Sequence, residues 1–249
     1  VVADLFVSCK QNLILGARVF DHTGQLLWTD DSVGDGHVAV ADFDLDGVPE
    51  IVIHRGGLVW LLSRDGQIIW GPTIVPRASY RWGGPPTVAD FDGDGYPDIG
   101  VAGEYGYTAL RNDGSVMWSR VTKDYGSGMT GSTAFDFLGD GKAKVVYADE
   151  SSVFVYDGQT GDSLLRIGSD SATALEYPLV VDADRDGHAE FVTVRNYCRC
   201  HGDAEAGSAV RVFEDANGGW VPTRSIWNQH AYSITNINDD LSVPRNPVP

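Results

Sequence analysis

The sequence predicts an all-β fold, a β-propeller of four-stranded antiparallel blades, and three observations support this prediction. An acidic loop recurs four times along the chain at nearly equal intervals. An apolar run of β type follows each copy, and a tight turn rich in Asp, Asn and Gly comes later in each unit. A period near 47 residues with four strands in each unit is typical of a propeller blade.

The clearest acidic loop is the segment 90–98, DFDGDGYPD, which is followed by the apolar run IGVA. Its carboxylates stand at positions 1, 3, 5 and 9, and at an effective dielectric of about 20 each close pair would repel by roughly 4 kcal/mol. Ca²⁺ accepts about six to eight such oxygens, and Gly95 provides the backbone freedom of a chain wrapped around an ion. The predicted side-chain ligands are Asp90, Asp92, Asp94 and Asp98.

An EF-hand is the nearest alternative, because its loop begins with the same spacing. It takes its last ligand from a Glu at position 12 and continues into a helix. Here position 12 is Val101, so the loop instead joins two strands. The pattern returns at 42–50 and 182–190, where the predicted side-chain ligands are Asp42, Asp44, Asp46 and Glu50, and then Asp182, Asp184, Asp186 and Glu190.

The copy at 136–144 is damaged. Leu138 stands at its third position and Lys144 at its ninth, so that an ammonium replaces a carboxylate. This loop is predicted to hold no calcium, which leaves about three Ca²⁺ ions as the expected cofactors of the chain.

The loops divide the chain into repeat units of one domain, 1–249. Their first positions, at residues 42, 90, 136 and 182, are separated by 48, 46 and 46 residues. The expected units are 1–35, 36–82, 83–128, 129–174 and 175–249.

The two ends of the chain are expected to complete one blade together. The first unit supplies strands at 3–8, 17–21 and 25–28 but no inner strand before them, whereas 233–238 has the form of an inner strand entering a loop. A C-terminal strand would close a ring of five blades and leave no open sheet edge. The alternative is a fragment of a larger propeller.

The charge is strongly acidic, with 35 Asp and Glu against 18 Lys and Arg. This composition argues against a nucleic-acid partner, because phosphate binding requires clustered basic residues. Three Ca²⁺ ions, with six positive charges, would move the net charge from −17 to −11. No stretch is apolar enough for membrane insertion by this segment. Because calcium loops fill best where calcium is plentiful, an extracellular or cell-surface location is expected, with further domains of a longer chain possible.

Three cysteines occur in the chain: Cys9, Cys198 and Cys200. A disulfide from Cys9 to Cys198 or Cys200 is the preferred interpretation, since ring closure would bring these strand ends together. A Cys198–Cys200 bridge, a zinc site with His201 and free thiols remain alternatives. The tryptophans after the tight turns, Trp28, Trp70 and Trp118, are expected to pack between blades.

The loops resemble the FG-GAP repeats of integrin α-subunits and their bacterial relatives, most closely over 88–101. The resemblance implies a calcium-binding propeller with a role in cell adhesion. It also implies a seventh-position ligand through a main-chain oxygen, which adds Val48, Tyr96 and His188. Integrin propellers have seven blades, whereas this chain holds about five units.

A ligand face is expected on the rim opposite the calcium loops, where loops carry aromatic residues. The alternative is that these residues fill blade junctions. The candidates are Tyr80, Arg81, Trp82, Glu104, Tyr105, Tyr107, Tyr125 and Tyr177.

The favoured function is a non-catalytic, calcium-stabilised extracellular module that binds a protein or glycan ligand. Motifs for a serine nucleophile, a zinc protease or a phosphate-binding loop do not occur in the sequence. The alternative is an enzyme on a propeller scaffold, either quinoprotein-like, as the turn at 156–161 suggests, or a glycoside hydrolase with two carboxylates across a cleft.

Overall fold

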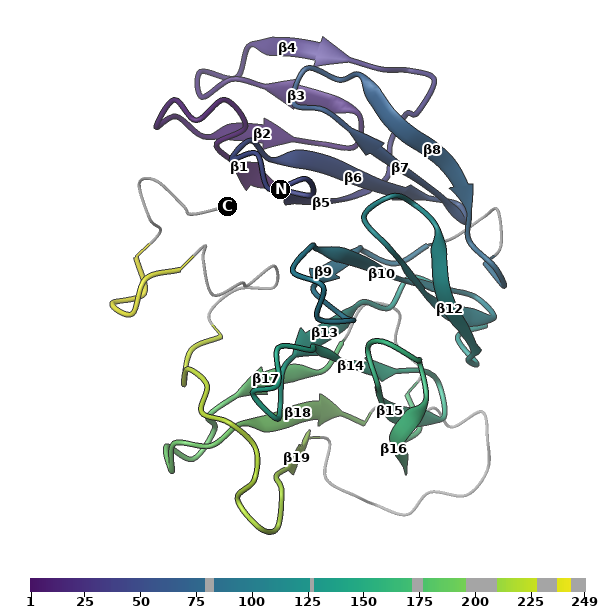
Figure 1. Ribbon diagram of the computed structural model, residues 1–249, viewed down its shortest axis with the longest axis vertical. Coiled ribbons are helices and arrows are strands. Elements are labelled where there is room, and N and C mark those ends of the chain that lie inside the picture. The colour runs from purple at the N-terminus through teal and green to yellow at the C-terminus, as the bar shows by residue number, and fades with distance from the viewer. Residues whose placement is uncertain (79–82, 126–127, 172–176, 196–209, 228–236, 243–249) are drawn as a thin grey trace.

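The computed structural model describes residues 1–78, 83–125, 128–171, 177–195, 210–227 and 237–242. In these residues the regular structure is entirely β and forms five antiparallel sheets, four of them with four strands and one with three. The sheets follow one another along the chain in a propeller-like arrangement (Figure 1). The predicted fold class is confirmed, and the alternative of a fragment of a larger propeller stays open.

Each sheet is a meander in which consecutive strands are neighbours. The first sheet consists of β1 (Val2–Ala3), β2 (Asn12–Ile14), β3 (Arg18–Phe20) and β4 (Leu26–Thr29), and the second of β5 (His37–Ala41), β6 (Glu50–Arg55), β7 (Leu58–Leu62) and β8 (Ile68–Ile74). The third consists of β9 (Thr87–Ala89), β10 (Asp98–Gly103), β11 (Gly106–Leu110) and β12 (Val116–Val121). The fourth consists of β13 (Ser132–Phe135), β14 (Lys144–Ala148), β15 (Ser152–Tyr156) and β16 (Ser163–Gly168), and the last of β17 (Leu179–Val181), β18 (Glu190–Val194) and β19 (Val210–Phe213).

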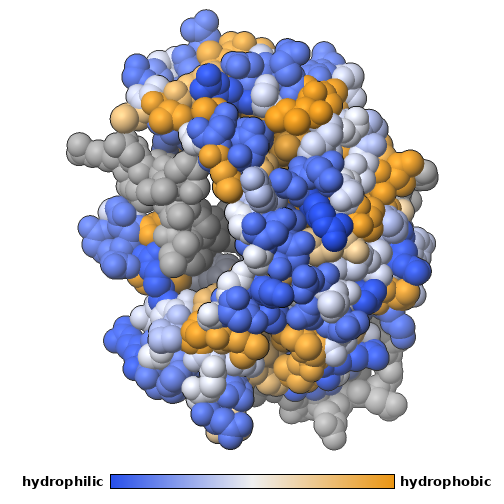
Figure 2. Space-filling model, in the orientation of Figure 1, coloured by the Kyte–Doolittle hydropathy of each residue, from blue (hydrophilic) through white to orange (hydrophobic). Residues whose placement is uncertain are grey.

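The core lies between the sheets. Strands β10, β14 and β15 are buried along their whole length, because both faces of an inner strand are covered by neighbouring sheets. The outer strands β4, β8 and β16 are largely exposed. The first strands lie side by side from sheet to sheet, since β9 contacts both β5 and β13, and β13 contacts β17. On the visible face, apolar patches are interspersed with hydrophilic surface (Figure 2).

Three tryptophans connect consecutive sheets. Each donates its indole N–H to a main-chain oxygen in the hairpin turn of the next sheet, and its ring lies where a Cβ on the turn glycine would be. Only glycine fits in such a contact, and these glycines also have positive φ. The prediction that the tryptophans pack between blades is confirmed. The pairs are Trp28 with Gly66, Trp70 with Gly114, and Trp118 with Gly161.

The first sheet is complete without the C-terminal segment, so the expectation that it lacks an inner strand is wrong. Strand β1 pairs with β2, with Val2 opposite Leu13 and Ala3 opposite Asn12. The expected strand at 3–8 is therefore a two-residue strand followed by a loop. Most of 233–238, the segment expected to close the ring, lies outside the described residues.

Candidate metal centres

The acidic loops occupy one place in the fold, between the first and second strands of their sheets. They connect β5 to β6, β9 to β10, and β17 to β18. In each loop, three carboxylates offer oxygens that lie within 4.8 Å of one another. These acidic clusters have the composition of a site for a hard metal ion. The clusters are Asp42, Asp44 and Glu50; Asp90, Asp92 and Asp94; and Asp182, Asp184 and Glu190.

Side-chain to main-chain hydrogen bonds fold these loops. In 90–98, the Asp90 carboxylate accepts from the N–H of Gly93 at 2.7 Å and from that of Gly95 at 2.9 Å. Both glycines have positive φ, 79° and 91°. The need for left-handed backbone at the fourth position was missed by the sequence analysis, because Leu45 and Arg185 adopt it, at 62° and 68°, in the other two loops.

The ninth residue of each loop is buried and tied to the second. Asp98 Oδ2 accepts from the Phe91 N–H at 2.9 Å, and Glu50 Oε2 accepts from the Phe43 N–H at 2.8 Å. Burial raises the pKa of Asp98 to about 7, and the pKa of Glu50 also to about 7; the other carboxylates of each loop add to both shifts. The hydrogen bond from the main-chain N–H lowers the pKa of each carboxylate, but by less than burial raises it. A cation beside these carboxylates would stabilise their charged form.

The loop 182–190 contains two oxygens that fit a metal ligand role most closely. Asp182 Oδ1 and Glu190 Oε1 are both buried and accept no hydrogen bond in the described part of the chain. The other Glu190 oxygen, Oε2, accepts from the Ala183 N–H at 2.6 Å, so of the two only Oε1 lacks a hydrogen bond in the described residues. Buried oxygens of this kind cost free energy unless a donor or a cation meets them.

In none of the three loops does the structure bring all four predicted carboxylates into one cluster. Asp46 and Asp98 lie outside the clusters of their own loops, and Asp186 instead joins Asp184 and Glu214 in a fourth, exposed group. Glu214, which follows β19, was missed because its distance along the chain gives no spacing signal.

The seventh-position residues donate their main-chain N–H to the fifth-position carboxylate of the loop. The three distances are 2.7, 2.8 and 2.8 Å. Their main-chain oxygens as ligands remain a prediction from the family resemblance. The residues are Val48, Tyr96 and His188.

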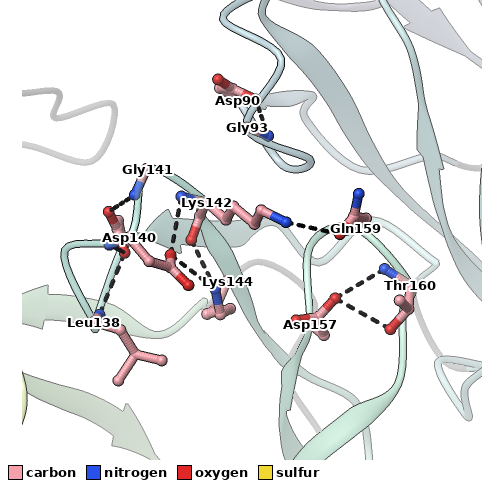
Figure 3. Close-up of polar contacts among 11 residues, drawn as sticks. Asp90, Gly93, Leu138, Asp140, Gly141, Lys142, Lys144, Asp157, Gln159 and Thr160 are labelled. Carbon is pink, nitrogen blue, oxygen red and sulfur yellow. Dashed lines mark hydrogen bonds and ion pairs between the residues drawn. The ribbon is translucent and has the colours of Figure 1, made fainter.

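The damaged loop 136–144 has the same backbone but its own cation. The ammonium of Lys144, whose side chain is 5% exposed, donates to the Lys142 carbonyl at 2.9 Å and lies 3.4 Å from Asp140 Oδ1 (Figure 3). These acceptors belong to the fifth and seventh positions of the loop. The Asp136 carboxylate holds the turn as Asp90 does, accepting from the Gly141 N–H at 2.7 Å. The Lys144 ammonium therefore supplies to this loop the positive charge that a metal ion would supply.

A fifth loop of this geometry, which the sequence analysis missed, spans residues 4–12 between β1 and β2. Asp4 accepts from the main chain of Ser8 at 3.0 Å and of Cys9 at 2.6 Å, and the Leu5 N–H donates to Asn12 Oδ1 at 3.3 Å. Val7 and Cys9, its fourth and sixth residues, have positive φ of 51° and 61°. Only Asp4 and Asn12 keep the polar pattern, so this loop is a copy with one carboxylate.

On the expected ligand face, Tyr105 and Tyr125 are 47% and 54% exposed, and their ring centroids are 5.5 Å apart. Glu104 accepts a hydrogen bond from Tyr105, which raises the pKa of that phenol. The half-buried Tyr177 lies beside Trp227, with ring centroids 6.5 Å apart.

Tyr107 is not part of this face, which corrects the prediction. It is fully buried, stacks on Trp118 and bonds to the Ser132 hydroxyl at 2.6 Å. Cys9 is exposed. The remaining candidates, Tyr80, Arg81, Trp82, Cys198 and Cys200, lie outside the described residues.

The fold and these loops define a class: a repeat β-propeller with acidic loops between its first and second strands. Residues 42–101 and 90–147 match the FG-GAP-like repeat family. Residues 42–147 of this propeller-like fold thus carry FG-GAP-like repeats. No curated protein matches it in sequence. Among the described residues, no helix is long and apolar enough to cross a membrane.

Solved structures share this fold at low sequence identity. The V. cholerae biofilm matrix protein Bap1 is similar with a TM-score of 0.81 and 17% identity, over 100% of this chain and 68% of that one. The Bacillus licheniformis rhamnogalacturonan lyase PL11 is similar with a TM-score of 0.56 and 17% identity, over 92% of this chain and 50% of the lyase. For the rhamnogalacturonan lyase YesW, the values are 0.55 and 15%, over 89% and 50%.

Proposed function

We propose that this chain is a non-catalytic, calcium-stabilised propeller that works outside the cell or on its surface, as an adhesion module that binds a protein or glycan. One Ca²⁺ ion would occupy each of the loops 42–50, 90–98 and 182–190. The ion has a structural role: it binds the folded loop and not the unfolded chain, and thereby stabilises the fold. The loop 136–144 stays without metal.

The observation that carries the calcium proposal is the pair of buried, unpartnered oxygens on Asp182 and Glu190. Carboxylate oxygens in a flexible loop suit Ca²⁺, whereas Mg²⁺ requires nearly ideal octahedral geometry and keeps most of its waters. The raised pKa values of Asp98 and Glu50 also support a bound cation, because burial and the neighbouring carboxylates raise them and no positive charge among the described residues lowers them.

The exposed tyrosine pair supports the binding proposal. Strand β10 begins at Asp98, the end of its metal loop, and ends at Gly103, just before Glu104 and Tyr105. Tyr105 and Tyr125 therefore belong to the opposite rim, on loops held by a rigid scaffold. Exposed aromatic rings of this kind are favoured in recognition sites, for both protein and glycan partners.

A panel of glycans and extracellular matrix proteins, screened with immobilised chain in calcium, tests this role. The matched variants are Tyr105→Ala with Tyr125→Ala on the rim, and Leu27→Ala, which is 45% exposed on the outer strand β4. We expect the rim variant to lose a partner that the Leu27 variant keeps. A partner retained by both variants would contradict the assignment of the face.

An enzyme is the second candidate, because two similar structures are rhamnogalacturonan lyases. At their identities the likeness concerns the fold, and the chain spans half the length of each lyase. Incubation with rhamnogalacturonan, with product size measured by chromatography, tests this candidate. Depolymerisation above that of a heat-inactivated sample would overturn the non-catalytic proposal.

A further inference from the structure

In two sheets, the residue that directly follows the third strand lies beside the acidic loop of the same sheet. In the third sheet this residue is Arg111, which follows β11, and its Nε lies 3.8 Å from Asp92 Oδ2 in the loop 90–98. In the last sheet it is Glu214, which follows β19, and one of its carboxylate oxygens lies within 4.8 Å of an oxygen of Asp184. Both contacts involve the third position of a loop, so the same place in the fold carries opposite charges in the two sheets.

The chain that leaves β19 passes beside the loop 182–190 and is held there (Figure 1). The His188 Nδ1–H donates to the Trp220 carbonyl at 2.9 Å, and the Asp182 N–H donates to the Arg224 carbonyl at 3.1 Å. The residue at the end of β19 is therefore kept next to the loop by contacts that do not involve its own side chain.

The loop 182–190 gives independent evidence for a cation at this place. Asp182 Oδ1 and Glu190 Oε1 are buried and lack a hydrogen bond in the described residues. Oxygens of Asp182, Asp184 and Glu190 lie within 4.8 Å of one another. Two oxygens that bind one Ca²⁺ ion at about 2.3–2.6 Å are at most roughly 5 Å apart, so these three can share an ion. Glu214 adjoins this group through Asp184, which belongs to both clusters.

We propose that the residue after the third strand sets the calcium affinity of the loop beside it. Glu214 raises the number of carboxylates in and beside the loop 182–190 from four to five, so this site binds Ca²⁺ most tightly. Arg111 offsets one of the four carboxylates of the loop 90–98, so this site binds Ca²⁺ most weakly. The physical reason is that the affinity of a calcium loop depends on the charge of its ligands.

The loop 42–50 takes the middle place in this order. It carries four carboxylates, and the residue after the third strand of its sheet, β7, is the neutral Ser63. The inference rests on the proposed function, because it ranks the three calcium sites that this function requires.

Hydrogen–deuterium exchange of the intact chain, followed by mass spectrometry over a series of free calcium concentrations, measures the three sites separately. Peptides from each loop become protected when an ion holds the loop, and so each loop gives its own midpoint. We expect the lowest midpoint for 182–190, then 42–50, then 90–98. One unit charge close to a divalent ion should change the midpoint about tenfold. Equal midpoints, or the reverse order, would overturn the inference.

Glu214→Gln tests the tightest site, since it removes one charge and keeps the size of the side chain. The midpoint of 182–190 should rise about tenfold while the other two midpoints stay the same. In chelator the melting temperature should stay the same or rise, because the variant no longer repels the neighbouring carboxylates. Asp31→Asn, which removes the charge of an exposed residue after β4, is the control and should change no midpoint. An unchanged midpoint for 182–190, or an equal rise in all three, would overturn the role of Glu214.

Arg111→Gln tests the weakest site and should act in the opposite direction. The midpoint of 90–98 should fall about tenfold, and those of the other two loops should not move. Because the two variants shift different loops in opposite directions, a general change in stability explains neither result. A midpoint for 90–98 that stays the same or rises would overturn the role of Arg111.

The parent chain separates this inference from the proposed function. If calcium protects none of the loops, the structural role of the ion is wrong, and the ranking fails with it. If calcium protects all three loops but their midpoints do not respond to either substitution, the inference alone is wrong.

Discussion

Loops 90–98 and 136–144 are neighbours that share a backbone and differ in charge. The Ala143 N–H of the second donates to the Asp90 carbonyl of the first at 2.9 Å. In both loops the first carboxylate accepts from the sixth N–H, at 2.9 and 2.7 Å. The loop 90–98 then buries a ninth carboxylate, and the loop 136–144 buries an ammonium in its place.

This difference indicates that the turn folds through its first-position carboxylate, whereas the need for a metal ion depends on the charge of the other loop residues. The turn forms wherever a first-position Asp can collect main-chain N–H groups, as it also does at Asp4. Under the proposed function, a metal ion is needed where several carboxylates meet with too little positive charge. In the loop 90–98, Arg111 Nε lies 3.8 Å from Asp92 Oδ2 and balances only one of four carboxylates. Lys144 supplies that charge from within the chain, so its loop should be stable without calcium.

Removal of calcium should have the largest effect, because it acts on three loops and spares 136–144. At free calcium about 100-fold above Kd, each site contributes about 2.7 kcal/mol, and three sites contribute about 8 kcal/mol. The melting temperature should therefore fall by roughly 15–30 °C when chelator is added. Calorimetry in calcium and in chelator measures this shift. Equal melting temperatures would contradict a structural role for the ion.

Conversion of the loop 136–144 to the acidic pattern should remove its difference in calcium binding from the loop 90–98. The double variant Leu138→Asp with Lys144→Asp restores carboxylates at the third and ninth positions. We expect one additional Ca²⁺ per chain and about 2.7 kcal/mol more calcium-dependent stability. Leu138→Asn with Lys144→Gln is the control, since it removes the ammonium without adding acids. A double variant that binds no more calcium than the parent would show that the loops differ in more than charge.

Single alanine substitutions in the two loops should respond differently to calcium. Asp92→Ala removes a predicted ligand and should cost about 2 kcal/mol more in calcium than in chelator, where it loses only the Asp94 N–H bond at 3.3 Å and the Arg111 contact at 3.8 Å. Asp140→Ala removes hydrogen bonds with the Lys142 N–H and the Lys144 ammonium, and should cost about 1 kcal/mol in both conditions. Denaturant unfolding of each variant with and without calcium measures the costs. Equal calcium sensitivity of the two would refute the assignment.

A further effect concerns pH in the absence of metal. Burial raises the folded-state pKa of Asp98 and Glu50 to about 7, above the unfolded values near 4, so the metal-free folded protein holds these protons more tightly. This stability is fully present below about pH 4 and is lost as pH rises to about 7. We expect the free energy of unfolding in chelator to fall between pH 5 and 8, and to fall less in calcium. Unfolding midpoints across that range test it; a rise with pH would contradict the sign.

The acidic loops and the tryptophan contacts could be predicted because they depend on side chains that the sequence shows directly. Trp118, for example, follows a recognisable turn and donates to a carbonyl of the next one at 2.5 Å. The loop 4–12 could not be predicted in this way. Its geometry depends on Asp4 and Asn12 bonding to the main chain, while Val7 and Cys9 occupy positions where glycine would have signalled a left-handed turn.

Tyr107 and Glu214 show two further limits of the sequence. Tyrosine suits both a binding surface and a core, and only the register of β11 and its neighbours decides that the Tyr107 hydroxyl meets Ser132 inside the molecule. Glu214 reaches Asp184 and Asp186 through the packing of the last sheet, which no local spacing encodes.

Calcium stoichiometry tests the central claim most directly. Equilibrium dialysis of the purified, metal-stripped chain against calcium should find three ions bound per chain, one for each loop that carries four carboxylates. Retention of fewer than two ions would contradict the claim that metal neutralises these loops, and with it the proposed calcium-stabilised module.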